Sequence, residues 1–378
     1  MLSRLHVKSL MRFLYWYQNH LSFPYHRNNR FGKAVEIYLP LVRPRKMTNI
    51  VGYCDGLVCI LDSKTIATWN PLIKKYKKLP REPIQKSSSF GNGDYCYSMF
   101  AFGHDPHKDD YKVVRIVEFV GSRYMETEVK IYSLKSQAWK KVDERWKDVE
   151  KHLPNKLPVI LSQILTTSLN GAEYWLIVPS GGYPKPELEL QSILAFDIVN
   201  EKMRVYKTPV QPKNDDNILN TSLGVLGGCL CFVVNVQNAK DMYYEVWLMK
   251  EYGVESSWTK VYKIEKGAMP EAFWSIEPLI FSRNGKKVLF QGIHFGCVKF
   301  IWYDVEKKRG KSVKIQNLPA MFALSVTSIG SLLLLDVHNT IHVNSPPQTQ
   351  GGCETNLRLS TKVRKRPLGC DLVKIAAS

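Results

Sequence analysis

The chain has 378 residues, of which 44% are hydrophobic and 23% are charged. This composition is typical of a globular protein with one large or two ordinary domains, and no apolar run approaches the roughly 20 residues of a membrane helix. The formal charge of +19 favours acidic partners or nucleic acid. Without a membrane-length apolar run we expect no membrane partner, and because the lysines are dispersed over predicted turns, we expect no nucleic acid as a partner.

The first 30 residues are predicted to contain a short amphipathic helix. Leu2, Leu5, Leu10 and Phe13 recur at helical spacing, and basic residues occupy the other faces. These basic residues interrupt the apolar segment that a secretory signal requires, so we expect an intracellular protein, in the cytoplasm, the nucleus or both. The helix either packs on the neighbouring domain or docks to another protein, and the residues leave both open.

From about residue 50 the chain alternates short β-prone segments with turn residues, which predicts an all-β domain. The first unit is Val51-Gly-Tyr-Cys-Asp-Gly-Leu-Val-Cys-Ile60, followed by Thr65-Ile-Ala-Thr-Trp-Asn-Pro71. Asp55 and Gly56 tolerate the positive φ of a tight turn, and Pro71 ends the second strand because it cannot donate to a ladder.

This unit recurs along the chain. Turn-and-strand starts fall at residues 56, 110, 171, 228, 285 and 330, separated by 54, 61, 57, 57 and 45 residues. Aromatic residues trail the starts at Trp69, Tyr132, Phe196, Trp247 and Tyr303. Such spacing, with four strands and one aromatic per unit, predicts a β-propeller of about six blades in which these aromatics pack between blades. A seventh blade is possible if the segment before residue 50 helps to close the ring.

The sequence predicts no catalytic centre, metal or cofactor. His104, Asp105, His107, Asp109 and Asp110 share one loop, but Pro106 and the flanking strands favour a turn in which aspartates accept hydrogen bonds from backbone N–H groups. The eight cysteines lie mostly in apolar strands, as free thiols do, and Cys229-Leu-Cys231 lacks the spacing of a zinc site.

The C-terminal segment, residues 346–378, is predicted to be mostly disordered because it is rich in Gln, Gly, Thr and Pro. It contains the basic cluster Lys362-Val-Arg-Lys-Arg366. This cluster is either a nuclear-import signal or a solvated part of the tail.

The dispersed motifs resemble the plant F-box associated domain. The resemblance begins with Val51–Ile60, Trp69-Asn-Pro71 and Tyr76-Lys-Lys-Leu-Pro80, and continues with Phe102-Gly-His-Asp105, Asp109-Asp-Tyr-Lys-Val-Val114 and Val129-Lys-Ile-Tyr-Ser-Leu-Lys-Ser136 with Trp139. Phe196-Asp197, Leu223-Gly-Val-Leu-Gly-Gly-Cys-Leu-Cys231, Val246–Val254 and Ser257-Trp-Thr-Lys260 follow in the same order. Residues 2–13 are similar to the middle of an F-box, although that family usually has proline at the position of His6.

The resemblance implies a kelch-like β-propeller over residues 50–345, preceded at residues 1–30 by a truncated, helical F-box remnant. It implies a non-catalytic adaptor that binds an unknown target protein and recruits it to an SCF (Skp–cullin–F-box) ubiquitin ligase for ubiquitination and degradation. A Skp-family adaptor and a cullin scaffold would be the partners. The Skp-family adaptor would dock on Leu2, Leu5, Val7, Leu10 and Phe13.

Two alternatives remain open from the sequence. The first is a propeller that binds target proteins but does not assemble into a ligase. The second is a propeller that binds or hydrolyses glycans, for which the aromatic content is the only support.

Overall fold

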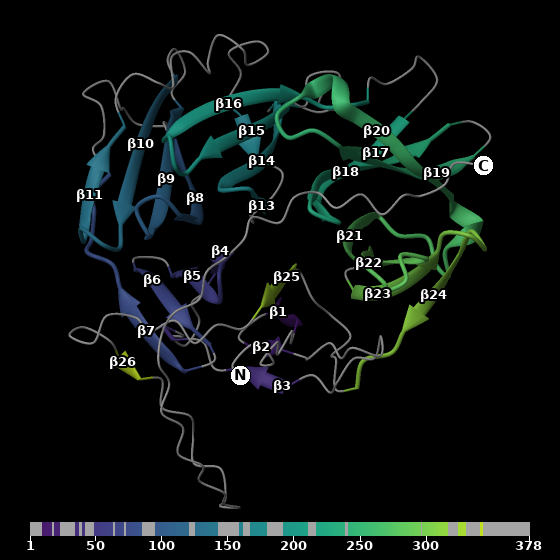
Figure 1. Ribbon diagram of the computed structural model, residues 1–378, viewed down its shortest axis with the longest axis horizontal. Coiled ribbons are helices and arrows are strands. Elements are labelled where there is room, and N and C mark those ends of the chain that lie inside the picture. Colours follow the sequence, from purple (N-terminus) through teal and green to yellow (C-terminus); the bar gives the residue numbers. More distant parts are fainter. Residues whose placement is uncertain are drawn as a thin grey trace, which may run out of the picture.

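The computed structural model describes seventeen segments of the chain, and the statements below refer to them. They are residues 10–16, 19–22, 35–37, 40–41, 49–62, 65–71, 73–84, 95–120, 125–142, 159–161, 167–179, 192–210, 217–238, 241–295, 297–316, 324–329 and 341–342. Figure 1 shows antiparallel sheets arranged as a ring around a common centre, which is the architecture of a β-propeller. The predicted all-β propeller is therefore confirmed.

Five sheets are built from strands that follow one another along the chain, and we call them blades 1 to 5. Blade 1 contains β4 (Asn49–Cys54), β5 (Leu57–Leu61), β6 (Ile66–Asn70) and β7 (Lys75–Lys78). Blade 2 contains β8 (Tyr95–Asp105), β9 (Asp110–Val120), β10 (Met125–Ser133) and β11 (Ala138–Lys141). Blade 3 contains β12 (Val159–Leu161), β13 (Thr167–Leu169), β14 (Ala172–Pro179), β15 (Ser192–Asp197) and β16 (Lys202–Lys207).

Blades 4 and 5 complete this series. Blade 4 contains β17 (Asn217–Leu226), β18 (Cys229–Gln237), β19 (Met242–Met249) and β20 (Trp258–Glu265). Blade 5 contains β21 (Ser275–Phe281), β22 (Lys287–His294), β23 (Cys297–Asp304) and β24 (Arg309–Val313). In blade 5, the first strand, β21, lies nearer the centre of the ring and the last, β24, lies on its rim (Figure 1).

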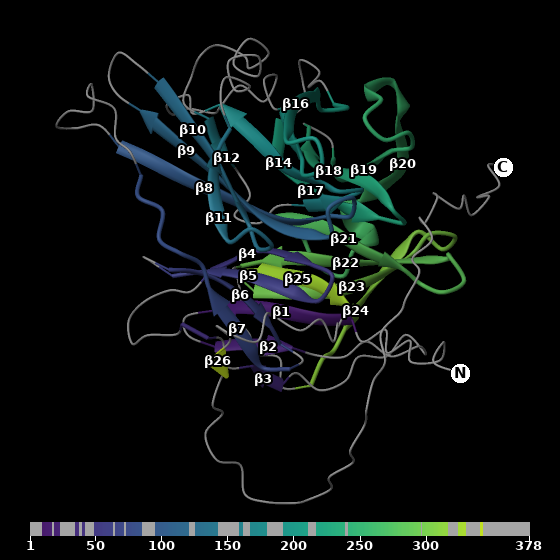
Figure 2. The same ribbon diagram turned by 60° about the vertical axis from the view of Figure 1, so that its left-hand side comes forward.

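A further sheet joins the two ends of the ring, and we call it the closing sheet. Its order is β25 (Leu324–Ile329), β1 (Leu10–Trp16), β2 (Asn19–Ser22) and β3 (Val35–Ile37). Figure 2 shows β25 beside β1, although they come from opposite ends of the sequence. The described residues thus form five blades rather than the six expected, and the closing sheet joins strands from opposite ends of the chain. The sixth start, at residue 330, and the strand predicted after it lie outside the described residues.

The closing sheet corrects the prediction of an N-terminal helix. Residues 10–16 and 19–22 form strands, and Leu10 and Phe13 lie opposite Ile329 and Val326 of β25. A strand supplied some 300 residues later cannot be detected from local periodicity, and tertiary pairing overrides a weak helical pattern. The predicted disordered tail, residues 346–378, lies outside the described residues.

The repeated aromatic residues occupy matching positions near the ends of β6, β10, β15, β19 and β23, each of which precedes the last strand of its blade. Trp69, Tyr132, Phe196 and Tyr303 are at most 3% exposed, and Trp247 is half-buried. In four blades the next residue is polar, and its side chain accepts a hydrogen bond from a backbone N–H of the following turn: Asn70, Ser133, Asp197 and Asp304. Each of these turns then contains a residue with positive φ: Lys74, Gln137, Glu201 and Lys308. The aromatic–polar pair therefore serves both packing and turn formation.

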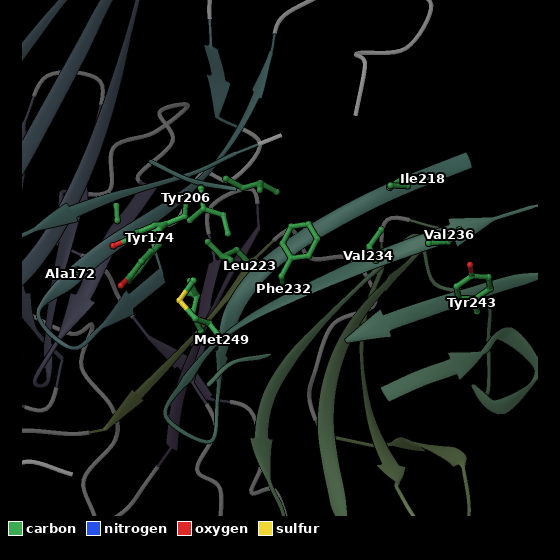
Figure 3. Close-up of a cluster of buried hydrophobic side chains, with 14 residues drawn as sticks. Ala172, Tyr174, Tyr206, Ile218, Leu223, Phe232, Val234, Val236, Tyr243 and Met249 are labelled. Carbon is green, nitrogen blue, oxygen red and sulfur yellow. The ribbon is translucent and has the colours of Figure 1, made fainter. Parts of the chain in front are cut away.

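Among the described residues, four of the six apolar clusters join adjacent blades, and the other two lie on blade 1 and on blade 5. One cluster joins blades 3 and 4 and includes Tyr174, Tyr206, Leu223, Phe232 and Met249 (Figure 3). Similar clusters join blades 1 and 2, blades 2 and 3, and blades 4 and 5. Adjacent blades thus bury apolar faces against one another, as expected for a propeller.

The remaining elements are short. Strand β26 (Ile341–His342) pairs with β7 and adds a fifth strand to the outer edge of blade 1. The helices among the described residues are two 3₁₀ turns, η3 (Glu255–Ser257) and η4 (Lys266–Ala268). In the part of the chain that the structure describes, no helix has the length and apolar character needed to cross a membrane.

Candidate functional site

The residues predicted from the sequence to dock a Skp-family adaptor do not form a site that the structure describes. Leu2, Leu5 and Val7 lie outside the described residues, and Leu10 and Phe13 belong to β1. The five repeated aromatics lie in the blades, where they contact neighbouring strands. A surface site must therefore be sought elsewhere on the ring.

Two exposed aromatic residues lie at one end of blade 5. Trp274 immediately precedes β21 and is 58% exposed, whereas Phe295 occupies the turn between β22 and β23 and is 90% exposed. The Trp274 N–H donates to the Ile293 carbonyl at 2.8 Å, which places both residues at the same end of the sheet. Phe295 has a φ of 45°, a left-handed conformation that is costly for a bulky side chain. We call Trp274, His294 and Phe295 the blade-5 aromatic patch.

The backbone below this patch is held by polar contacts from blade 4. The Tyr244 hydroxyl donates to the Phe273 carbonyl at 2.6 Å and accepts from the Phe273 N–H at 3.0 Å. Asn235 Nδ2 donates to the Trp274 carbonyl at 2.9 Å. These buried donors and acceptors fix the segment that presents Trp274.

His294 is fixed in a similar way. Its Nδ1 lies 2.6 Å from the Ala272 carbonyl oxygen, to which it must donate because a carbonyl only accepts. Its Nε2 faces Glu271 at 3.4 Å, and Glu271 also accepts from Lys299 Nζ at 2.6 Å. The imidazole and the Phe295 ring have centroids 4.6 Å apart. The patch is thus an apolar surface on a fixed base, with a charged rim.

This arrangement suits the binding of a protein surface. Exposed aromatics on a held backbone lose little conformational entropy on binding, and such residues often contribute most of an interface's affinity. No group of three or more potential metal ligands occurs in the part of the chain that the structure describes. The charged pair of Glu271 and Lys299 could orient a partner around the aromatic centre.

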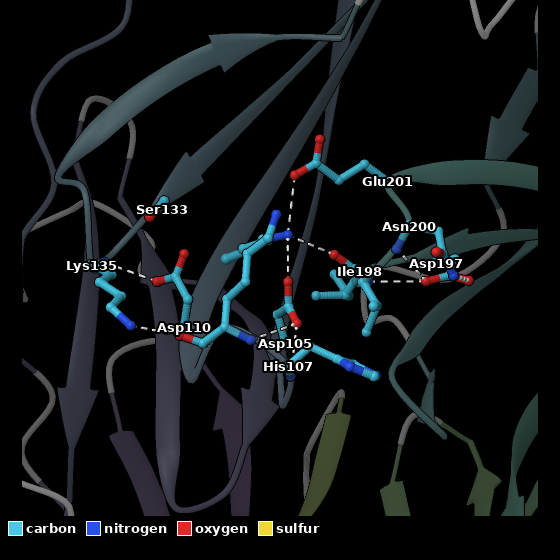
Figure 4. A network of polar contacts seen from close by, with 12 residues as sticks. Asp105, His107, Asp110, Ser133, Lys135, Asp197, Ile198, Asn200 and Glu201 are labelled. Carbon is cyan, nitrogen blue, oxygen red and sulfur yellow. Dashed lines mark hydrogen bonds and ion pairs between the residues drawn. The ribbon is translucent and has the colours of Figure 1, made fainter.

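A second polar feature joins blades 2 and 3, and we call it the blade 2–3 ion cluster (Figure 4). Lys112 Nζ donates to Asp105 at 2.9 Å, to Glu201 at 3.1 Å and to the Ile198 carbonyl at 2.8 Å. Lys140 pairs with the other Glu201 oxygen at 3.1 Å. Asp105 also accepts from the backbone N–H groups of the turn at residues 107 and 108, which confirms the predicted turn.

Burial and charge have opposing effects on the pKa values in this cluster. Burial raises the pKa of Asp105, but hydrogen bonds from Lys112 and from the turn outweigh it, so the pKa lies below its ordinary value. Burial likewise raises the pKa of Glu201, and Lys112 and Lys140 bring it below normal. Burial lowers the pKa of Lys112, but the two carboxylates bring it above normal. All three groups are therefore charged at neutral pH, and the cluster stabilises contact between blades.

A third polar group attaches the connector after blade 1 to blade 2. Arg115 donates to the Glu82 carbonyl at 2.6 Å and to Glu128 at 3.0 Å. Lys130 Nζ donates to the Glu82 carboxylate at 2.6 Å. These contacts order residues 82–83 against blade 2, so we interpret this group as structural.

The ring of antiparallel sheets defines the chain as a β-propeller. The family profile of the F-box associated beta propeller domain matches residues 21–324. The chain therefore belongs to this family, which agrees with the resemblance found in the motifs.

Known relatives are F-box proteins of Arabidopsis thaliana. The chain is 28% identical to F-box protein CPR1 over 84% of its own length and 76% of that protein. It is 27% identical to F-box protein At4g22390, covering 69% of the chain and 63% of that protein. It is 28% identical to F-box/kelch-repeat protein At3g23880, covering 58% of the chain and 54% of that protein. The chain thus spans less than two thirds of the length of the latter two relatives.

Among solved structures, TolB from Acinetobacter baumannii aligns with a TM-score of 0.41 at 8% identity, covering 85% of this chain and 66% of that one.

Proposed function

We propose that this protein is the substrate-recognition subunit of an SCF-type ubiquitin ligase. Membership of the F-box associated beta propeller domain family is the observation that carries this proposal. In this proposal the propeller binds a target protein, and a Skp-family adaptor and a cullin scaffold connect it to a separate conjugating enzyme. The protein performs no chemistry itself, and it acts inside the cell, in the cytoplasm, the nucleus or both.

The blade-5 aromatic patch is the surface that we propose for the target protein. Trp274 and Phe295 are the two most exposed large apolar side chains among the described residues. They lie outside the inter-blade cores, so packing does not account for their exposure. Loops at the end of a rigid ring are a common location for binding sites.

One alternative has a specific observation in its favour. Residues 10–16 form a strand of the closing sheet, whereas the resemblance to an F-box implied a helix there. A protein whose N-terminal residues are used in this way could bind targets without docking a Skp-family adaptor. The alternative is therefore a propeller interaction module that does not assemble into a ligase.

Capture of a Skp-family adaptor separates these two functions. We expect the purified chain to retain a purified Skp-family adaptor on affinity resin, and the complex to survive gel filtration. A fusion of a complete F-box to the N-terminus provides the positive control. Capture by the fusion alone would contradict the ligase function for this chain and support the alternative.

Removal of the aromatic patch should abolish target binding without unfolding the protein. For the double variant Trp274→Ala, Phe295→Ala we expect at least a tenfold loss of captured partners, about 1.4 kcal/mol or more, because exposed aromatic anchors dominate many interfaces. Stability should change by less than about 1 kcal/mol, since both side chains are largely exposed. The measurement is quantitative affinity proteomics with wild type and variant in parallel.

A matched variant controls for the loss of exposed apolar area. Ile84 and Val254 are 38% and 39% exposed, and neither belongs to the patch. The double variant Ile84→Ala, Val254→Ala should retain the partners of the wild type. Equal losses in the two double variants would contradict the assignment of the patch.

A further inference from the structure

The outer edge of blade 5 carries a groove that the proposed function does not use. It has a volume of about 800 Å³, and five of its eleven lining residues are basic: Lys287, Lys307, Arg309, Lys311 and Lys314. Asp304 is the one acidic residue among these lining residues. We call it the β24 groove, because most of its lining belongs to β24 and its flanks.

Two cations of this groove, Arg309 and Lys311, differ from Lys140 and Lys260 on other outer strands. Lys140 of β11 pairs with Glu201 at 3.1 Å, and Lys260 of β20 pairs with Glu245 at 2.8 Å. In contrast, no acidic side chain of the described residues lies within ion-pair distance of Arg309 or Lys311. Lysine on an edge strand often serves only to discourage pairing. Unpaired cations that converge on a concave surface with a tryptophan require a further explanation.

The register of the sheet shows how the groove is organised. On one face of blade 5, Asp304 lies opposite Arg309, Trp302 opposite Lys311, and Phe300 opposite Val313. Arg309, Lys311 and Val313 therefore alternate along β24 on a single face. Trp302 is half-buried and lies opposite Lys311, so it provides an apolar floor beside this cation. The face presents two positive positions and one apolar position at a spacing of two residues.

The edge of β24 is also free for main-chain pairing. Strand β24 ends the order of its sheet, and it pairs with β23 alone among the described strands (Figure 1). In blade 1 the outer strand β7 pairs with a further strand, β26, through Ile341 and His342. An outer strand of this ring can therefore pair with an additional strand. Addition of an extended segment to an exposed edge is a general mode of peptide recognition.

We propose that the β24 groove binds an extended acidic segment of a partner protein, which adds to blade 5 as a fifth strand. Directly opposed residues of paired strands lie about 5 Å apart, so acidic side chains at alternate positions would face Arg309 and Lys311. An apolar side chain two positions further would face Val313. The preferred segment thus has two acidic residues and one apolar residue, each separated by one residue.

Nucleic acid fits this groove less well. Binding of single strands uses successive aromatic platforms on which bases stack, and Trp302 is the one aromatic residue of the lining. The alternation of charge along β24 matches the two-residue period of a strand. The β24 groove shares no lining residue with the blade-5 aromatic patch, so this binding goes beyond the proposed function. The free chain should bind such a segment without any Skp-family adaptor.

The test measures peptide binding to the full chain by fluorescence anisotropy. The probes are 11-residue labelled peptides with the core Val-Thr-Glu-Thr-Glu or its reverse, since the strand direction is part of the measurement. Matched peptides carry Gln in place of Glu. We expect at least one Glu peptide to bind tenfold or more tightly than its Gln counterpart, and the double variant Arg309→Glu, Lys311→Glu to lose at least tenfold in affinity. Hydrogen exchange of the β24 amides should slow when the peptide is bound.

A second charge reversal controls for the overall charge of the protein. Lys202→Glu, Lys207→Glu changes the net charge equally on β16, another outer strand, where both lysines are exposed. This variant should bind the Glu peptide within about threefold of wild type, and circular dichroism should show that both double variants remain folded.

Three results would overturn the proposal. The first is equal affinity for the Glu and Gln peptides, and the second is an equal loss in both charge-reversal variants. The third is tighter binding of a 12-nucleotide uridine RNA than of either Glu peptide, because RNA would then be the favoured ligand. None of these results depends on capture of a Skp-family adaptor, so an experiment can contradict this proposal without contradicting the ligase function, and the reverse.

Discussion

The variant Lys112→Met is expected to lower the free energy of unfolding by about 3–5 kcal/mol, because it leaves buried carboxylates without their cation. Lys112 is 3% exposed and Asp105 is fully buried. The ammonium group makes three hydrogen bonds, and those to the Ile198 carbonyl and Glu201 cross from blade 2 to blade 3. The change should appear as a lower midpoint in urea denaturation, with the β-sheet circular dichroism of the native state retained.

Lys140 provides a matched control for this variant. It pairs with the same carboxylate, Glu201, at the same distance of 3.1 Å as Lys112, but its side chain is 72% exposed. Exposed ion pairs contribute about 0–1 kcal/mol, so Lys140→Met should be nearly neutral. Similar effects of the two substitutions would contradict the role that we assign to burial.

The pH dependence gives an independent check on the same cluster. The pKa values of Asp105 and Glu201 are lowered in the folded protein, so the stability that they contribute is present above their unfolded pKa values, about 4. It is lost as the pH falls through the folded pKa values. In Lys112→Met the buried Asp105 carboxylate has lost its cation, and protonation removes this uncompensated charge. The stability difference between wild type and variant should therefore narrow as the pH falls from 7 toward 3, and a constant difference would contradict the assignment.

The sequence predicts the repeating parts of this fold because they depend on local chemistry. Asp55 and Gly56 both have positive φ, as predicted for the first tight turn, and so do Asn170 and Gly171 at the corresponding turn of blade 3. The aromatic–polar pairs, such as Phe196-Asp197, combine a buried ring with a side chain that accepts backbone N–H groups of the next turn. Residue type and spacing are sufficient to specify these features.

The parts that the sequence did not predict depend on register and on distant strands. Phe273 and Trp274 are adjacent aromatics, yet one is 1% exposed and the other 58%. Only the pairing of β21 with β22 determines which of them faces the solvent. Lys112 is similar, because its partners Ile198 and Glu201 come from the next blade. The strand β1 likewise depends on pairing with β25.

Gly52 is expected to be among the least replaceable residues of the first unit, Val51–Ile60. A Cβ at this position would lie 2.8 Å from Phe102 Cβ and 3.1 Å from the Phe102 backbone nitrogen. Phe102 is fully buried in β8, so it cannot move without separating blades 1 and 2. We expect Gly52→Ala to lower the free energy of unfolding by about 2–3 kcal/mol, the upper part of the range for overpacking. Urea denaturation measures the change.

Two other glycines separate this steric effect from conformational strain. A Cβ at Gly228 would meet nothing within 4 Å, but its φ is +80°, so Gly228→Ala should cost about 1–2 kcal/mol. A Cβ at Gly267 would also meet nothing within 4 Å, and this residue needs no left-handed φ. Gly267→Ala should therefore be neutral within about 0.5 kcal/mol. The predicted order of destabilisation is Gly52, then Gly228, then Gly267. A neutral Gly52→Ala would mean that blades 1 and 2 can separate without loss, and the glycine of the opening motif would then need a reason other than contact between blades.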